Sequence, residues 1–180
     1  MKKRNRKTKS RLYVCHTFYH VYVAILKEMK LARTMPADAY KKADIALSAI
    51  STDFENLGDR LTKTELFDRV IALDEKREDF FPALAKYRKN YSSILKHMVN
   101  RMIFTKKLAK CEAPYMEVID FAAYKDIYVF CDSDPIGYYL NYKHIYYHAV
   151  EDGLDCLKNL DDAYVANHGH FKLKTWFSRH

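Results

Sequence analysis

The stretch that decides the fold is LYVCHTFYHVYVAILK, residues 12–27. Its first part, residues 12–16, is a short apolar run that suits a strand buried on both faces. Thr17 can then cap a helix over residues 18–33, because its side-chain oxygen can accept a hydrogen bond from a backbone N–H of the first turn. The side of this helix that we predict to be buried carries Val21, Ile25, Met29 and Ala32.

The same alternation of strand and helix continues along the chain. Apolar runs predict four more strands, over residues 43–50, 69–73, 127–131 and 144–150. Helical patterns predict helices over residues 53–61, 82–113, 116–123 and 135–142. Pro82 suits the first turn of the longest helix, and Pro114 is expected to end it.

Strands that alternate with helices and read as continuous apolar runs indicate an α/β fold. We predict a doubly wound, mostly parallel, Rossmann-like sheet of about five strands. We divide the chain into a disordered basic tail, residues 1–10, and a single domain, residues 11–180. The four glycines among 180 residues are few, so each is expected to meet a backbone requirement.

Basic side chains are concentrated in two stretches of a chain whose formal charge is +8. Residues 1–11 carry seven Lys and Arg, residues 80–111 carry eight, and neither stretch contains an acid. This charge predicts a negatively charged partner, such as anionic lipid, a polyanionic glycan, nucleotide phosphate or nucleic acid. A solvated helix face together with a flexible tail is the alternative.

The cysteine usage and hydropathy bear on the cellular compartment. The four cysteines have no CxxC spacing, which favours a reduced compartment without structural disulfides. No window approaches the ~18 uninterrupted apolar residues of a membrane span. We expect a cytoplasmic location, with peripheral attachment to the inner face of the cell membrane as an option.

Polar side chains follow three of the predicted strands directly. They are His16 and Thr17 after the first strand, Asp132, Ser133 and Asp134 after the fourth, and Glu151, Asp152 and Gly153 after the fifth. Ligands of open parallel sheets bind outside the carboxyl ends of the strands. We therefore predict that these residues meet at one edge of the sheet and contact a ligand there.

Two of these clusters suggest chemistry. A carboxylate of Glu151 or Asp152 could remove the proton of a sugar hydroxyl, and Gly153 would let the backbone bend to admit the substrate. The alternative is that Asp152 or Asp155 only caps the next helical turn. Asp132-Ser133-Asp134 resembles a DxD signature, in which acids hold Mg²⁺ or Mn²⁺ against a sugar nucleotide. The alternative is that Asp134 caps a helix that begins at Pro135.

Two stretches carry a resemblance to a known family. YVCHTFYHVYVAILK resembles the start of bacterial sialyltransferase-like and capsular-polysaccharide glycosyltransferases, with Phe18 where the family commonly has proline. CDSDPIGYYLNYKHIYYHAVEDG is similar to the segment of that family that ends in an acid-acid-Gly motif. The resemblance covers roughly residues 11–157.

The resemblance implies a GT-B enzyme, in which two Rossmann-like domains face a cleft and CMP-activated sialic acid is transferred with inversion. It implies no required metal or other cofactor, and it makes Asp152, in preference to Glu151, the base on the acceptor hydroxyl. The family's His-Pro pair, which meets the donor in the C-terminal domain, does not occur in this sequence. We therefore expect the acceptor-side half of such an enzyme, inactive alone, from bacterial surface polysaccharide or lipooligosaccharide synthesis.

The partners expected on this interpretation are a glycan acceptor, a sugar nucleotide held by a C-terminal domain, an anionic membrane surface and a second copy of the chain in a homodimer. Two alternatives remain. One is a metal-dependent, DxD-type sugar-nucleotide transferase. The other is a non-catalytic basic module for nucleic acid or membrane. Nucleic acid is the less favoured partner, because the basic residues interleave with helix-core residues and match no recognition motif.

Overall fold

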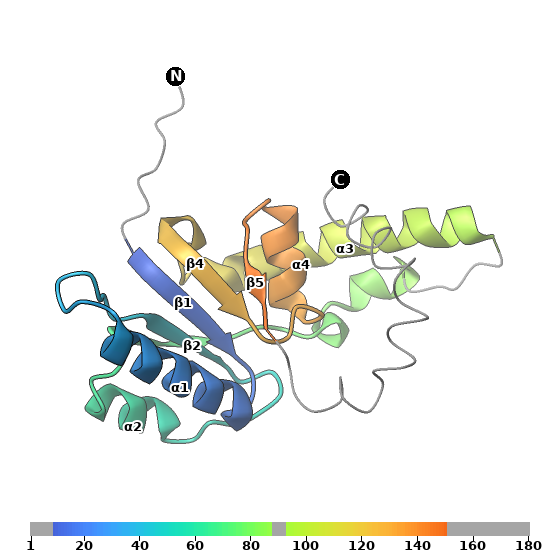
Figure 1. Ribbon diagram of the computed structural model, residues 1–180. Helices are drawn as coiled ribbons and strands as arrows, with labels where there is room; N and C mark the ends of the chain where they lie inside the picture. Colours follow the sequence, from blue (N-terminus) through green and yellow to red (C-terminus); the bar gives the residue numbers. More distant parts are fainter. Residues whose placement is uncertain (1–8, 88–92, 151–180) are drawn as a thin grey trace, which may run out of the picture.

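The described part of the chain, residues 9–87 and 93–150 of the computed structural model, forms one sheet of five parallel strands (Figure 1). The strands are β1 (Lys9–Cys15), β2 (Asp44–Ser48), β3 (Arg69–Leu73), β4 (Tyr124–Val129) and β5 (His148–Ala149). Their order across the sheet is β3-β2-β1-β4-β5. The predicted doubly wound, Rossmann-like α/β fold is confirmed.

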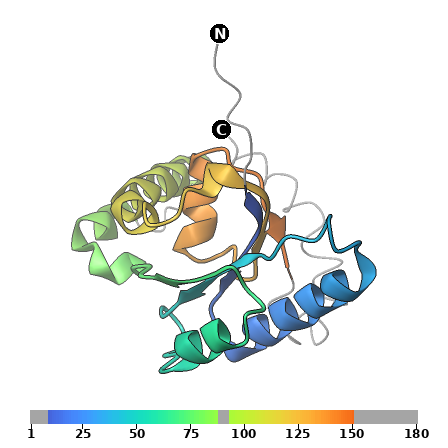
Figure 2. The ribbon, with the colours of Figure 1, turned by 90° about the vertical axis from the view of Figure 1, so that its left-hand side faces the viewer.

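Helices cover both faces of this sheet (Figure 2). On one face lie α1 (Phe18–Thr34) and α2 (Leu57–Lys63), and on the other lie α3 (Ile94–Met116) and α4 (Pro135–Tyr142). Short 3₁₀ helices complete the connections: η1 (Glu78–Phe80), η2 (Pro82–Tyr87) and η3 (Phe121–Ala123). Every helix within residues 9–87 and 93–150 is too short or too polar to span a lipid bilayer.

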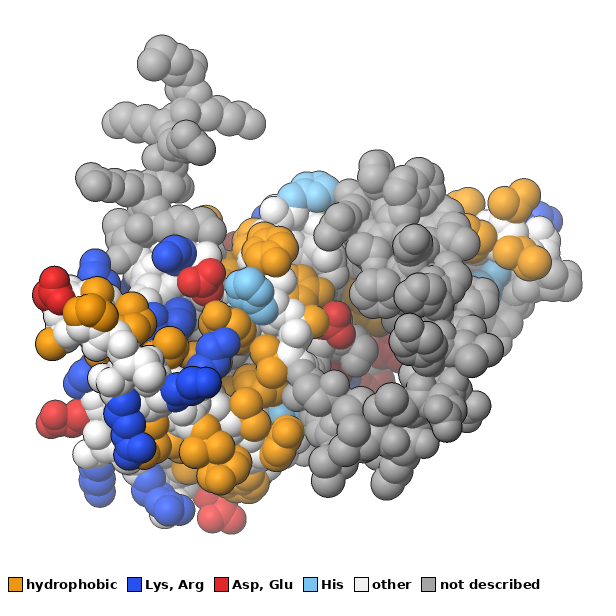
Figure 3. Space-filling view, viewed as in Figure 1, with side chains coloured by type: hydrophobic (Ala, Val, Ile, Leu, Met, Phe, Trp, Pro, Cys, Tyr) orange, Lys and Arg blue, Asp and Glu red, His pale blue; other side chains and the backbone are white. Residues whose placement is uncertain are grey.

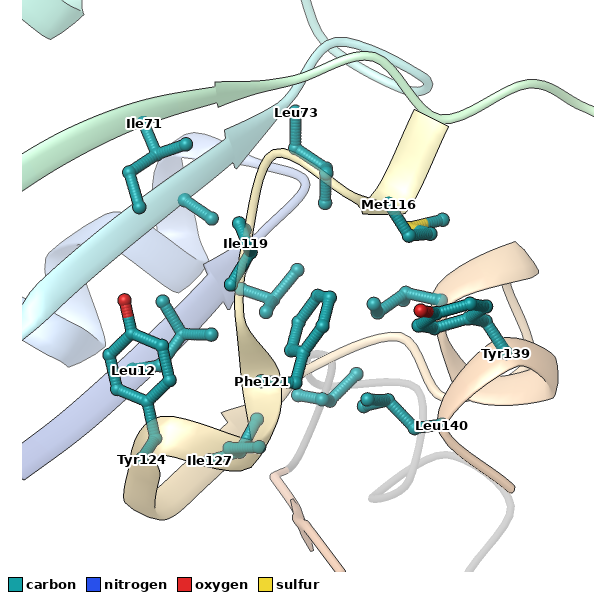
Figure 4. Packing of buried hydrophobic residues seen from close by; sticks show 14 residues of the cluster. Leu12, Ile71, Leu73, Met116, Ile119, Phe121, Tyr124, Ile127, Tyr139 and Leu140 are labelled. Carbon is teal, nitrogen blue, oxygen red and sulfur yellow. The ribbon is translucent and has the colours of Figure 1, made fainter. Parts of the chain in front are cut away.

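The central strand β1 contributes side chains to both halves of the core. Leu12 and Val14 belong to the cluster on the α3 and α4 side, which Figure 4 shows, and Tyr13 and Cys15 belong to the cluster on the α1 and α2 side. Successive side chains of a strand point to opposite faces, and here both faces are covered. That is why the strand reads as a continuous apolar run and not as an alternating one.

The predicted strand boundaries are correct in part. The strand over residues 69–73 has the observed bounds. β1 begins three residues before the predicted start, because Lys9 pairs with Tyr124 of β4 and its ammonium contacts Asp44 Oδ2 at 2.7 Å. β5 contains only two of the seven residues predicted over 144–150, since it pairs with β4 alone among the described strands.

The helix over residues 135–142 has the observed bounds, whereas the helix predictions need correction at four other points. The longest predicted helix does not begin at Pro82, which opens the 3₁₀ helix η2, and α3 begins only at Ile94. α2 begins at Leu57, because Asp53 accepts a hydrogen bond from the N–H of Glu55 in a turn and does not cap the helix. Pro114 does not end α3, which continues to the fully buried Met116. Only η3 forms within the helix predicted over residues 116–123.

Candidate functional site

The strand order makes the chain diverge in opposite directions from β1 and β4. From β1 the chain turns to α1 and the β2 side of the sheet, and from β4 it turns to α4 and the β5 side. The two connections therefore diverge from neighbouring strands at their carboxyl ends, which is where doubly wound sheets bind ligands. His16 and Thr17 follow β1 there, and Asp132 to Asp134 follow β4.

Three side chains from three different strand ends meet at this edge. His16 Nε2 lies 2.8 Å from Glu75 Oε1 and 3.8 Å from Asp134 Oδ2. The side chains of His16 and Glu75 are fully buried, and Asp134 is partly open to solvent. The structure thus brings together two of the residues predicted to contact ligand, His16 and Asp134, and adds Glu75 from the segment after β3.

Glu75 uses both carboxylate oxygens to join separate parts of the fold. Its Oε1 faces His16, while its Oε2 accepts the backbone N–H of Ile136, in the first turn of α4, at 3.1 Å. When Glu75 is ionised, His16 Nε2 carries the hydrogen and donates it, which leaves Nδ1 as the acceptor atom of the neutral ring. Nδ1 is buried without a hydrogen-bond partner among the described residues.

The start of α1 holds the histidine loop in place. Thr17 is the N-cap, as predicted, and its hydroxyl oxygen accepts the N–H of His20 at 3.4 Å. His20 Nδ1 in turn accepts the backbone N–H of His16 at 3.0 Å, and its ring stacks on Phe130 with centroids 4.6 Å apart. Thr17 and His20 therefore constrain the loop from which the His16 ring contacts Glu75.

The Asp132-Ser133-Asp134 cluster does not act as one group. Asp134 stands at the N-cap position of α4 but makes no capping hydrogen bond with its side chain, and burial raises its pKa, against the opposing effect of His16. Asp132 Oδ2 instead accepts a long hydrogen bond of 3.5 Å from Tyr147. The two carboxylates therefore contact different partners, which does not fit a shared cation in a DxD arrangement. Ser133 is exposed in the same turn.

The acid-acid-Gly motif lies outside the described residues, so the roles predicted for Glu151, Asp152 and Gly153 stay predictions. The described chain ends one residue earlier, at Val150. The N–H of Val150 donates to Val129 O at 2.8 Å, next to the carboxyl end of β4. The chain therefore reaches the edge of the sheet that carries His16 and Asp134.

One cluster at this edge has metal-ligand chemistry. His16, His20 and Cys131 each offer a ligand atom, and these atoms lie within 4.8 Å of one another. Bond lengths of about 2.0–2.3 Å would bring the ligand atoms of a tetrahedral zinc site to within about 3.8 Å of one another. The Nδ1 atom of His20 is already engaged by the N–H of His16. The ligand atoms of this cluster therefore spread over a longer distance than those of a zinc site, and His20 Nδ1 is already used in a hydrogen bond.

Glu112 of α3 is a second buried acid near this edge, and it is expected to make stability depend on pH. Its side chain is fully buried, and Oε2 accepts the N–H of Lys76 at 3.2 Å, while Oε1 has no partner among the described residues. Burial raises the pKa of Glu112 from 4.5 to about 7. The carboxylates of Glu75 and Asp74 also raise this pKa, and the hydrogen bond from Lys76 lowers it. Below pH 4.5 the group is neutral in both the folded and the unfolded state.

Between pH 4.5 and 7 the folded protein holds a proton at Glu112 that the unfolded chain has released, so stability falls as the pH rises. The full loss above pH 7 is about 3 kcal/mol. We expect Glu112→Gln, which resembles the neutral acid, to flatten this dependence and to raise the free energy of unfolding at pH 8 by about 2 kcal/mol. Urea denaturation at pH 5 and pH 8 tests this, and a mutant with the wild-type pH dependence would contradict it.

A cavity lies at the opposite, amino-terminal end of the sheet. Its volume is about 270 Å³, and its lining consists of Lys9, Ser10, Arg11, Lys41, Lys42, Asp44, Asp68 and Tyr124. Two of the cations are paired within the protein, Lys9 with Asp44 and Arg11 with Glu28. These pairs have a structural role, so the cavity does not compete with the polar cluster as the candidate site.

Sequence reasoning missed Glu75, although a signal was present. Asp74 and Glu75 follow the strand over residues 69–73 directly, as an acidic pair at a carboxyl end. This is the same pattern that singled out the residues after the first, fourth and fifth strands.

Comparisons with protein-family models, with curated proteins and with solved structures each gave no match.

Proposed function

We propose that this chain is the acceptor-side domain of an inverting, sialyltransferase-like glycosyltransferase that acts in bacterial surface polysaccharide or lipooligosaccharide synthesis. The observation that carries the proposal is the meeting of His16, Glu75 and Asp134 at the carboxyl ends of three parallel strands, β1, β3 and β4. A ligand-binding edge of a Rossmann-like sheet is what one domain of a GT-B enzyme contributes to its cleft. The resemblance of residues 11–157 to such enzymes supplies the class of reaction.

The side chains at this edge suit a neutral, hydroxyl-rich ligand. Asp134 is partly exposed and can accept hydrogen bonds from sugar hydroxyls. The first-turn N–H of Ile136 already donates to Glu75, so a carboxylate of the protein occupies a position where a phosphate would be stabilised. This occupancy supports a glycan acceptor, in preference to a nucleotide, as the ligand of this domain.

In this proposal Asp152 removes the proton of the attacking acceptor hydroxyl, with Glu151 as its neighbour and Gly153 permitting close approach of the substrate. His16, Thr17, Asp132, Ser133 and Asp134 form the surroundings of the acceptor. The position of Val150, which follows β5 and donates to Val129 O at the end of β4, supports this assignment, because the next residue along the chain is Glu151. The donor would be CMP-sialic acid.

Acceptor binding by this chain tests the proposal directly. We expect isothermal titration or ligand-observed NMR to detect binding of a galactoside such as lactose and no binding of CMP. Asp134→Asn should weaken the galactoside about 10- to 100-fold, since a hydrogen bond to a charged group contributes about 1.5–3 kcal/mol. Asp68→Asn, an exposed acid at the opposite end of the sheet, is the control and should leave the affinity unchanged.

Three outcomes would count against the proposal. They are binding of CMP in place of the galactoside, an Asp134→Asn variant with wild-type affinity, and no affinity for any galactoside or sialoside. In a preparation that transfers sialic acid, Asp152→Asn should leave acceptor binding intact and lower the transfer rate at least 100-fold. Equal losses of binding and transfer would assign Asp152 to binding and not to proton removal.

A further inference from the structure

The outer face of α3 combines exposed apolar and basic side chains. Leu95, Val99 and Ile103 follow one another at intervals of four, so they form a single line along the helix. They expose 74%, 55% and 39% of their surface. Lys110 lies on the same side of the helix towards the carboxyl end, and Lys96 flanks the line. We call these five residues the α3 face.

The α3 face has no partner among the described residues. The opposite side of the helix carries the buried residues, namely Phe104, Leu108, Ala109, Glu112 and Met116. That side contacts α4, and η2 packs beside the helix, with Tyr87 near Asn100 and Lys107. The amino-terminal half of α3 also projects beyond the sheet (Figure 1), and hydrophobic and basic side chains lie together at that end (Figure 3).

The exposed charges of α3 itself are of one sign. The stretch of residues 80–111 holds eight Lys and Arg and no acid, and the single acid within α3, Glu112, is fully buried. An amphipathic helix with lysines beside a line of aliphatic residues can lie in the plane of a bilayer interface. The aliphatic side chains then enter the acyl boundary while the lysine stems extend to the lipid phosphates.

We propose that the α3 face docks this protein on an anionic lipid bilayer. A soluble polyanion would use the lysines but would leave Leu95, Val99 and Ile103 in water. A protein partner would use the aliphatic line, but lysine is depleted from protein–protein interfaces. An anionic bilayer engages both, which makes it the partner whose chemistry fits the whole face.

A second apolar line lies on α1 and provides a matched comparison. Tyr22, Leu26 and Met29 expose 58%, 47% and 39% of their surface, close to the values on α3. Within α1 itself three basic side chains remain, because its single acid, Glu28, is buried. However, the segments beside α1 add exposed acids, so that residues 18–66 contain seven basic and seven acidic side chains in all. Charge complementarity therefore selects α3 and not α1, although both lines are similarly exposed.

The experiment is co-sedimentation of the full chain with vesicles. We expect binding to vesicles of equal parts phosphatidylcholine and phosphatidylglycerol, little binding to phosphatidylcholine alone, and release as salt shortens the screening length. Lys96→Gln with Lys110→Gln should lower the partition coefficient roughly 25-fold, at about fivefold for each lysine. Leu95→Gln with Val99→Gln and Ile103→Gln leaves the charge unchanged and should lower it at least about tenfold.

The controls repeat the same changes on α1. Tyr22→Gln with Leu26→Gln and Met29→Gln, and separately Lys30→Gln with Arg33→Gln, should each leave the partition coefficient within about twofold of wild type. Glutamine is a good helix former, so circular dichroism should show that all four variants keep the wild-type helix content.

The outcomes separate the possible occupants of the face. Wild-type binding by both α3 variants, or equal losses from the α1 variants, would overturn the proposal. A loss with the lysine changes alone would assign the face to a soluble polyanion and would equally overturn it. Because none of these residues lies at the carboxyl edge of the sheet, failure here leaves the acceptor-binding proposal standing, and the reverse also holds.

Discussion

Gly137→Ala is expected to cost more than about 4 kcal/mol of folding free energy, or to prevent folding altogether. A Cβ atom at this position would lie 1.9 Å from Asp132 O, 2.6 Å from Asp132 C and 2.8 Å from Asp132 Cα. These are backbone atoms of the turn between β4 and α4, so no side-chain rotation can relieve the overlap. The turn itself would have to move.

The same turn carries the candidate site, which is why the effect extends to function. Asp134 N donates to Cys131 O at 3.2 Å, and Gly137 N donates to Asp134 O at 2.9 Å. A shift of the turn would draw the N–H of Ile136 away from Glu75 and Asp134 away from His16. We therefore expect any Gly137→Ala protein that folds to have lost galactoside binding as well.

Gly58→Ala is the matched control, and urea denaturation is the measurement. The nearest atom to a Cβ at Gly58 is Val70 Cγ1 at 3.9 Å, an ordinary contact, and the residue lies within α2. Alanine in a helix is favoured over glycine by about 0.5–1 kcal/mol, so this change should be neutral or stabilising. A Gly137→Ala protein within about 1 kcal/mol of wild type would contradict the steric argument.

Glu28→Ala is expected to cost about 3–5 kcal/mol, because it leaves a buried guanidinium without its counter-charge. Glu28 is fully buried in α1, and Arg11 of β1 is nearly so. Arg11 Nε and Nη2 donate to the two carboxylate oxygens at 2.8 Å each. The hydroxyls of Tyr13 and Tyr40 donate to the same oxygens at 2.7 Å and 3.1 Å. One carboxylate thus satisfies four donors.

Two further variants distinguish the charge from the packing. Glu28→Gln keeps the volume and one acceptor oxygen, so it should cost less than Glu28→Ala. Arg11→Met combined with Glu28→Met removes both charges and should cost less than the sum of the two single changes, since apolar residues can replace a buried ion pair. An additive pair would show that the two side chains do not stabilise the fold together.

The control for this prediction is an ion pair that solvent reaches. Lys76 and Asp74 are also paired, but the Asp74 side chain is 73% exposed. Asp74→Ala should change the free energy of unfolding by no more than about 0.5 kcal/mol, because exposed pairs contribute little. Equal effects at Glu28 and Asp74 in the same denaturation series would contradict the assignment of Glu28 as a buried anchor.

Much of the fold could be predicted from the sequence, because apolar runs and helix starts leave local marks. The strand over residues 69–73 and the helix over residues 135–142 were predicted with their observed bounds. The strand prediction failed over residues 144–150, where no side chain is fully buried. Of the predicted strand over residues 144–150, Tyr146 is 71% exposed and only two residues pair with β4.

Only part of the candidate site could be predicted, namely the side chains that directly follow strands whose carboxyl ends were expected to contact a ligand. His16 and Asp134 stand directly after β1 and β4, and parallel topology brings those strand ends together whatever the side chains do. Glu75 belongs to the far strand β3, at the edge of the sheet. Its contact with His16 depends on the path of the chain after β3 and on the position of α4, neither of which has a local signal.

The sequence by itself determined the alternation of buried strands and helices, and with it the parallel sheet. The reason is that apolar strand runs and helix caps depend on residues that are neighbours in the sequence. Only the tertiary structure decided which side of each helix is covered. Glu28 is charged yet buried, since Arg11 lies 17 residues away in sequence but opposite it in the fold. Met29 and Ala32 were predicted to lie on the buried side of their helix, yet both are exposed. Burial depends on what packs opposite a side chain, and that partner comes from a distant part of the chain.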